Sequence, residues 1–112
     1  MEILITNDDG INSPGLCKLS ESLYPLGNVT VVAPAKDQSG IGAAITLRSP
    51  IRAHSIKFPD PSVNAFSVEG TPGDCVILAI ETLMKEPPDL IISGINRGAN
   101  MGLDIFLSGT VG

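Results

Sequence analysis

The sequence predicts an α/β fold built on a Rossmann-like, doubly wound and mostly parallel sheet. Three short apolar runs rich in β-branched residues indicate buried strands: 2–6 (EILIT), 29–33 (VTVVA) and 89–93 (DLIIS). A helical segment separates the first two, so these strands are expected to pair in parallel through a right-handed crossover. The chain has 112 residues, 43% hydrophobic and 17% charged, which predicts one domain over residues 1–112.

The first helix is expected between the first two strands. Ser13 suits the N-cap position, and Pro14 suits the first helical position. Leucines at helical spacing continue to Leu23, and Gly27 is a suitable end for the helix.

The middle of the chain predicts extended structure that is less buried. After a Gly- and Ala-rich loop at 34–44, the runs 45–47, 51–58 and 63–68 are broken by proline and aspartate. The run 51–58 alternates imperfectly between apolar and polar residues, which indicates a hairpin-like arm partly open to solvent.

A second helix is expected after a capping box at residues 71–74. Residues 75–84 are apolar on nearly every face, so this helix is expected to be largely buried. It ends before two prolines, and residues 94–102 are then expected to form a loop. The first helix alone is little cover for the sheet, so some apolar surface is expected to remain exposed.

Composition excludes several classes of protein. Seven basic and twelve acidic residues give a net charge of −5 without any run of Lys or Arg, which argues against binding a nucleic acid polymer. No apolar stretch approaches the roughly 20 residues of a membrane span, and the N-terminus carries no basic segment, so no membrane association is expected. Cys17 and Cys75 both lie in helical patterns, which indicates reduced core thiols and a cytoplasmic protein.

The candidate site consists of polar loops that follow the three predicted strands. They are 7–10 (NDDG), 37–40 (DQSG) and 94–98 (GINRG). Ligands in open α/β sheets bind outside the carboxyl ends of the strands, where such loops converge. Asp8 and Asp9 can face one ligand only if the chain turns there, which Gly10 permits. An ordinary Asx turn is the alternative for this pair.

The donor types indicate a hard cation. The candidate loops offer only Asp carboxylates, a Ser hydroxyl and an Asn carbonyl, which suit Mg²⁺ or Mn²⁺ rather than zinc. The single histidine, His54, lies in the predicted hairpin and is interpreted as a surface residue. Arg97 could bind a phosphate or point to solvent. Residues 108–110 (SGT) could form an anion site at a helix start, although these residues alone favour an ordinary N-cap.

Five blocks of the sequence resemble the SurE (survival protein E) family of metal-dependent phosphatases. They are ILITNDDGINSPG, VVAPAKDQSG, GTPGDCV, DLIISGINRGANMG and SGTVG, in this order along the chain. The resemblance implies that one divalent cation, Mg²⁺ or Mn²⁺, is bound by Asp8, Asp9, Ser39 and Asn96. It also implies that Ser108, Gly109 and Thr110 contact the substrate phosphate. Family members continue past the last block, so the chain resembles the N-terminal portion of a longer protein.

The function expected from this resemblance is hydrolysis of nucleoside 5′- and 3′-monophosphates to nucleoside and phosphate. Asp8 and Asp9 are the candidate catalytic residues, and either an activated water or one aspartate could be the nucleophile. The longer protein is expected to form a homo-oligomer. One alternative is a non-catalytic fragment that binds metal or phosphate. Another is a receiver-like signalling domain, but the strands ending at Ala33 and Ser93 lack the phospho-accepting aspartate that a receiver requires.

Overall fold

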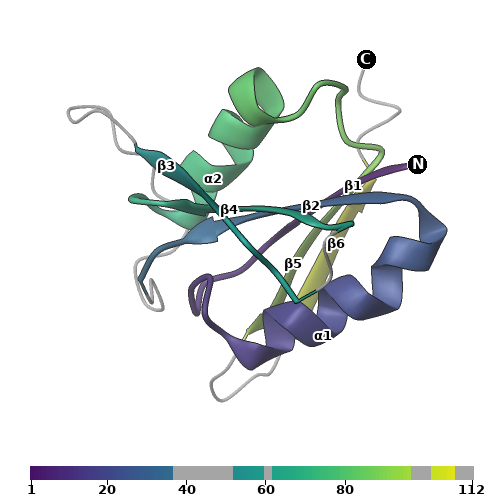
Figure 1. The fold of residues 1–112 in the computed structure, drawn as a ribbon, viewed down its shortest axis with the longest axis horizontal. Coiled ribbons are helices and arrows are strands. Elements are labelled where there is room, and N and C mark those ends of the chain that lie inside the picture. Colours follow the sequence, from purple (N-terminus) through teal and green to yellow (C-terminus); the bar gives the residue numbers. More distant parts are fainter. Residues whose placement is uncertain (37–51, 60–61, 97–101, 108–112) are drawn as a thin grey trace.

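The computed structural model describes residues 1–36, 52–59, 62–96 and 102–107, in which six strands form one sheet of order β3-β4-β2-β1-β5-β6. The four inner strands run parallel, and β3 and β6 pair antiparallel at the two edges. Figure 1 shows this twisted sheet with helices on both sides. The strands are β1 (Glu2–Thr6), β2 (Asn28–Pro34), β3 (Ala53–Ile56), β4 (Asn64–Val68), β5 (Leu90–Asn96) and β6 (Gly102–Leu107).

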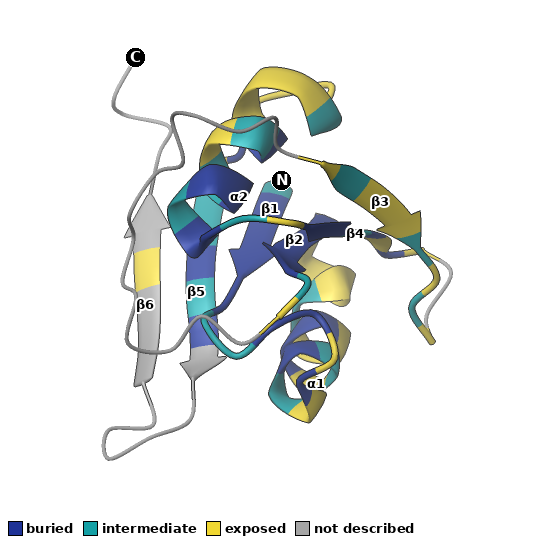
Figure 2. Ribbon diagram, turned by 90° about the vertical axis from the view of Figure 1, so that its left-hand side faces the viewer, coloured by how far each residue is buried: buried dark blue, intermediate teal, exposed yellow. Residues whose placement is uncertain are grey.

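The predicted Rossmann-like sheet is therefore confirmed, including its three central strands. The neighbours of β1 are β2 and β5, and Ile5 pairs with Val31 on one side and Ile92 on the other. All three of these side chains are at most 2% exposed, because the parallel strands have both faces covered. Figure 2 shows β1 and β2 as almost entirely buried.

Helix α1 (Pro14–Leu23) covers one face of the sheet, and α2 (Pro72–Leu78) covers the other. A 3₁₀ turn, η1 (Tyr24–Leu26), follows α1, and a π-helical turn, η2 (Ala79–Leu83), continues α2. Alternate residues of each strand supply the two cores, as the pleat requires. In β1, for example, Ile3 belongs to the core beneath α1 and Leu4 to the core beneath α2.

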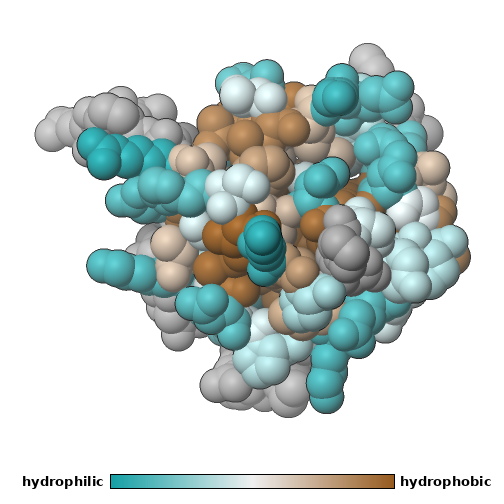
Figure 3. All heavy atoms as spheres, viewed as in Figure 1, coloured by the Kyte–Doolittle hydropathy of each residue, from teal (hydrophilic) through white to brown (hydrophobic). Residues whose placement is uncertain are grey.

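The expectation of a largely buried second helix is wrong. Pro72, Asp74, Cys75 and Ala79 are buried, but Ile77 is 39% exposed and Ile80 is 42% exposed. Figure 3 shows apolar side chains gathered on the outer surface over the end of α2 and η2. A helix on a sheet buries only the stripe that faces the strands unless another layer covers it. The expected exposure of apolar surface is accordingly present on this helix.

Two further differences concern the edges of the sheet. The segment predicted as a loop from residue 94 begins as strand, because β5 continues to Asn96, and β6 was not predicted. The hairpin-like arm is present, since β3 pairs antiparallel with β4. Its edge strand is mostly open to solvent (Figure 2). The predicted run 45–47 lies outside the described residues.

Candidate functional site at the carboxyl edge of the sheet

The parallel arrangement brings the ends of β1, β2 and β5 to the same edge of the sheet. Thr6 at the end of β1 pairs with Ser93 in β5. On the other side, the amide of Ile11 donates a hydrogen bond of 2.8 Å to the carbonyl of Pro34, the last residue of β2. The loop that carries Asp8 and Asp9 begins where β1 ends, beside β5. At its far end, Ile11 attaches it to the end of β2.

This acidic loop is shaped by the side chain of Asn7, which is completely buried. Asn7 Oδ1 accepts a hydrogen bond of 3.1 Å from the Gly10 amide, and Asn7 Nδ2 donates one of 3.0 Å to the Gly10 carbonyl. Gly10 has a φ of 106°, which L-residues with a side chain rarely adopt. The predicted turn is therefore present, and Asn7 and Gly10 together close it.

Asp8 and Asp9 lie between Asn7 and Gly10, whose two hydrogen bonds clamp the turn, and both aspartates are partly exposed. The turn allows two adjacent carboxylates to be presented at one edge, which a straight strand would not. Like charges held together favour binding of a cation. The role of Asn7 was missed at the sequence level, although an Asn three residues before a Gly is a recognisable Asx-turn signal.

Ser13 occupies the N-cap position of α1, as predicted, but its hydroxyl makes no capping hydrogen bond. The main chain of Ser13 makes the hydrogen bonds here. Its amide donates to the Gly10 carbonyl at 3.1 Å, and its carbonyl accepts from the Leu16 amide at 3.1 Å. The start of α1 is consequently held to the acidic loop by main-chain contacts.

Of the other proposed ligands, only Asn96 belongs to the part of the chain that the structure describes. Asn96 is the last residue of β5, so its backbone lies at the same edge as the acidic loop. Gly94, with a φ of 147°, accompanies a shift in the pairing of β5 with β6 between Ser93 and Asn96. Ser39, Arg97, Ser108, Gly109 and Thr110 lie outside the described residues.

The carboxylate oxygens of Asp8 and Asp9 are suitable ligands for a hard divalent cation. The loop supplies carboxylate oxygens, which suit Mg²⁺ and Mn²⁺. Within the described ranges, no three His, Cys, Asp or Glu side chains gather as a metal cluster, so a softer site of the zinc type has no support there. A cation here would need further oxygen donors or water beyond the two aspartates.

His54 lies at the surface, as predicted. Its Nε2 is 2.9 Å from Glu69 Oε2, and the two side chains are 58% and 52% exposed. The hydrogen bond to His54 lowers the pKa of Glu69, and the charges of His54, Arg52 and Lys36 act in the same direction. Such an exposed pair contributes little to stability.

Both cysteines are free thiols, as predicted, but only Cys75 is a core residue, since it is fully buried whereas Cys17 is partly exposed. Burial raises the pKa of the Cys75 thiol to about 12, and the neighbouring Thr6 hydroxyl offsets only part of this rise. Thr6 Oγ1 is itself a buried hydroxyl that has no hydrogen-bond partner among the described residues. The thiol therefore stays protonated near neutral pH and is unsuited to act as nucleophile or metal ligand.

None of the helices in the described part of the chain has the length and apolar character needed to cross a membrane.

Comparison with known proteins identifies the family. The family described as "Survival protein SurE" matches residues 3–112. Two proteins named 5′-nucleotidase SurE, from Moorella thermoacetica and Syntrophotalea carbinolica, are 53% and 54% identical to the chain over 111 residues. Each alignment covers 99% of this chain but only 43% and 42%, respectively, of the relative's length.

The fold agrees with a solved structure as well. The crystal structure of the SurE protein from Aquifex aeolicus matches with a TM-score of 0.73 and 41% sequence identity, over 91% of this chain and 40% of that chain. The match over nearly the whole sequence, together with the sheet and the acidic loop at its carboxyl edge, shows that the chain belongs to the SurE family.

Proposed function

We propose that this chain is part of a divalent-metal-dependent phosphomonoesterase that hydrolyses nucleoside 5′- and 3′-monophosphates. The observation that carries the proposal is the Asp8-Asp9 pair, held on a clamped turn at the carboxyl edge of the sheet in a member of the SurE family. The names of the relatives support nucleotidase activity.

The proposed site has two parts. Asp8, Asp9, Ser39 and Asn96 hold one divalent cation, Mg²⁺ or Mn²⁺, which when bound supplies positive charge to stabilise the phosphoryl oxygens in the transition state. Ser108, Gly109 and Thr110 hold the phosphate through hydroxyl and main-chain N–H donors. These donors also offset the negative charge that an acidic protein of net charge −5 presents to its substrate.

The chemistry that the residues themselves can perform is general-base or nucleophilic catalysis. One carboxylate of the Asp8-Asp9 pair either accepts a proton from the attacking water or attacks phosphorus itself. Asn7 serves as a positioning residue, because its two hydrogen bonds to Gly10 set the direction of the loop that carries both carboxylates. In the first route, the P–O bond to the nucleoside breaks, and the proton taken from water passes to the leaving nucleoside oxygen as phosphate is released. In the second route, the nucleoside oxygen leaves with a proton from water, and a second water then hydrolyses the phosphorylated aspartate to release phosphate.

The cellular setting is part of the proposal. Two free thiols, one of them fully buried, are consistent with a reducing compartment, and we assign the protein to the cytoplasm. Nucleoside monophosphates are the proposed partners, with neither nucleic acid polymers nor membranes involved. The longer protein is proposed to form a homo-oligomer.

The test is an assay of phosphate release from AMP and from 3′-AMP by the 112-residue chain and by a longer version. Activity is expected to disappear in excess EDTA and return with Mg²⁺ or Mn²⁺. Asp8→Asn is expected to weaken cation binding, measured by calorimetry, and to lower kcat by about two orders of magnitude. Glu21→Gln, which changes an exposed carboxylate on α1, is the matched control and should change neither value.

A second variant separates the two halves of the proposed site. Ser108→Ala is expected to lower kcat/KM while cation affinity stays nearly unchanged, because it removes a phosphate donor only. Full turnover in EDTA would exclude a metal-dependent reaction. Cation binding without turnover in both versions of the protein would favour the non-catalytic reading.

A further inference from the structure

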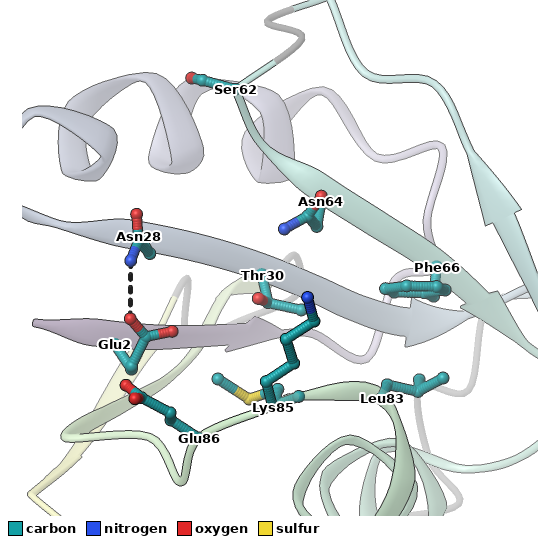
Figure 4. Close-up of a pocket in the computed structure, with 10 residues that line it drawn as sticks. Glu2, Asn28, Thr30, Ser62, Asn64, Phe66, Leu83, Lys85 and Glu86 are labelled. Carbon is teal, nitrogen blue, oxygen red and sulfur yellow. Dashed lines mark hydrogen bonds between the residues drawn. The ribbon is translucent and has the colours of Figure 1, made fainter.

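A hollow of about 640 Å³ lies at the edge of the sheet opposite the acidic loop. Its floor is the amino-terminal half of β1, β2 and β4, on the same face that α2 covers further along, and the segment after η2 forms its wall (Figure 4). The volume falls within the range of about 300–1,000 Å³ that is usual for small-molecule sites. The hollow is distinct from the proposed nucleotidase site, because it lies at the amino ends of the strands.

The floor of this hollow is polar, whereas the part of the same sheet face beneath α2 is mainly apolar. On β2, Val32 belongs to the core beneath α2, whereas Thr30 and Asn28 on the same face line the hollow. Asn64 of β4 extends this polar floor. Thr30 is only 6% exposed, so a largely desolvated hydroxyl lies at the base. Polar groups that converge in a concave site are the ones that orient a small ligand.

Acidic, basic and apolar side chains follow one another along the hollow. Figure 4 shows the carboxylates of Glu2 and Glu86 at one end, the apolar side chains of Phe66 and Leu83 at the other, and the Lys85 ammonium between them. Glu2 is held in place because its Oε2 accepts a hydrogen bond of 2.7 Å from Asn28 Nδ2. The Lys85 side chain extends over the floor towards the strands (Figure 4).

From this order we propose that the hollow binds a free α-amino acid with an apolar side chain. The ammonium group of the ligand lies at Glu2 and Glu86, its carboxylate lies at Lys85, and its side chain lies against Phe66 and Leu83. Each charge of the zwitterion then meets a group of opposite sign, and the apolar part meets the apolar end. A phosphate or other anion without an ammonium group would face two carboxylates against one lysine, which disfavours it.

The experiment measures binding of L-leucine to the 112-residue chain by calorimetry. Two analogues each lack one charge: isocaproate has no ammonium group, and isoamylamine has no carboxylate. Leucine is expected to bind saturably, and each analogue is expected to bind at least about tenfold more weakly, which corresponds to about 1.4 kcal/mol.

Variants then assign the contacts. Lys85→Gln and Glu86→Gln are each expected to weaken leucine binding by about tenfold, with thermal melts unchanged because both side chains are exposed. Lys18→Gln, an exposed lysine on α1, is the control and should bind leucine as the wild type does.

Three results would overturn the proposal. The first is an absence of saturable leucine binding, and the second is equal binding of isocaproate, which would indicate a simple carboxylate site. The third is binding by the 112-residue chain but not by the longer version, which would mean that the rest of the protein occupies the hollow.

Discussion

At the scale of a single residue, Asn7 closes the turn that carries the proposed metal ligands Asp8 and Asp9. Asn7→Ala removes both hydrogen bonds to Gly10 and leaves the buried Gly10 amide without its partner, so a loss of about 1–3 kcal/mol in the free energy of unfolding is expected. Cation affinity should fall in the same variant, because Asp8 and Asp9 lie within the turn. Urea unfolding and calorimetric titration with Mn²⁺ measure the two effects.

The matched control for this change is Asn12→Ala, since Asn12 is exposed just beyond the same turn. Its stability should stay within about 0.5 kcal/mol of the wild type, as for other surface changes. Equal stability of Asn7→Ala and Asn12→Ala would show that the clamp does not stabilise the loop.

Cys75 predicts a specific dependence of stability on pH. Its folded pKa of about 12 lies above the ordinary value of 9.0, so below pH 9 the thiol is protonated in both the folded and unfolded states. Between pH 9 and 12 only the unfolded state releases the proton. The free energy of unfolding should therefore fall with rising pH in this window, by up to about 1.4 kcal/mol per pH unit from this group.

The variant Cys75→Ala isolates this effect. It should be less stable than the wild type at pH 7, because a buried side chain has been shortened, and the difference should narrow as the pH rises above 9. Cys17→Ala retains Cys75 and should keep the full decline. A constant difference between Cys75→Ala and the wild type from pH 7 to 11 would contradict the burial of the thiol.

At the scale of an element, the start of α2 is stabilised by a complete capping box. Thr71 Oγ1 accepts from the Asp74 amide at 3.2 Å, and Asp74 Oδ2 accepts from the Thr71 amide at 2.9 Å. Thr71→Ala should cost about 1 kcal/mol in thermal or urea unfolding because the first hydrogen bond is lost. Thr82→Ala, at an exposed position in η2, should have little effect, and a Thr71→Ala variant as stable as Thr82→Ala would argue against the cap.

At the scale of the whole molecule, the outer surface of α2 and η2 predicts self-association of the 112-residue chain. Ile77 and Ile80 lie three residues apart and are both exposed, and Ile105 on the edge strand β6 is 57% exposed. Sedimentation or light scattering should show oligomers whose amount rises with protein concentration. The double variant Ile77→Glu/Ile80→Glu should shift the chain towards monomer without lowering Tm, since neither side chain is in the core.

Comparison with the longer version completes this prediction. The 112-residue chain is expected to be the poorer phosphatase, because it spans only 43% and 42% of the length of the two nucleotidase relatives. A monomeric 112-residue chain with undiminished turnover would show that both parts of this prediction are wrong.

The sequence by itself determined the features that depend on short-range chemistry. The β-branched runs predicted β1, β2 and β5, and the spacing of residues 71–74 predicted the capping box, as the structure shows. The oxygen-rich loops predicted a site at the carboxyl edge of the sheet, which stays a prediction. The turn at Asp8 and Asp9 could be predicted from Gly10, whereas their assignment as metal ligands came from the resemblance to the SurE family and stays a prediction. Each of these sequence patterns spans only a few consecutive residues, so it can be recognised without knowing which elements pack beside it.

Only the tertiary structure decided which partners those elements meet. The buried stripe of α2 is set by a sheet that lies on one side of it, so Ile77 and Ile80 are exposed although the helix is apolar all round. Strand β6 forms because β5 has an open edge with unpaired main-chain groups, and no local pattern records that edge. The polar hollow, likewise, exists because α2 and η2 end before the amino ends of the strands are covered. Long-range hydrogen bonding and burial determine these features, and both depend on residues far apart in the chain.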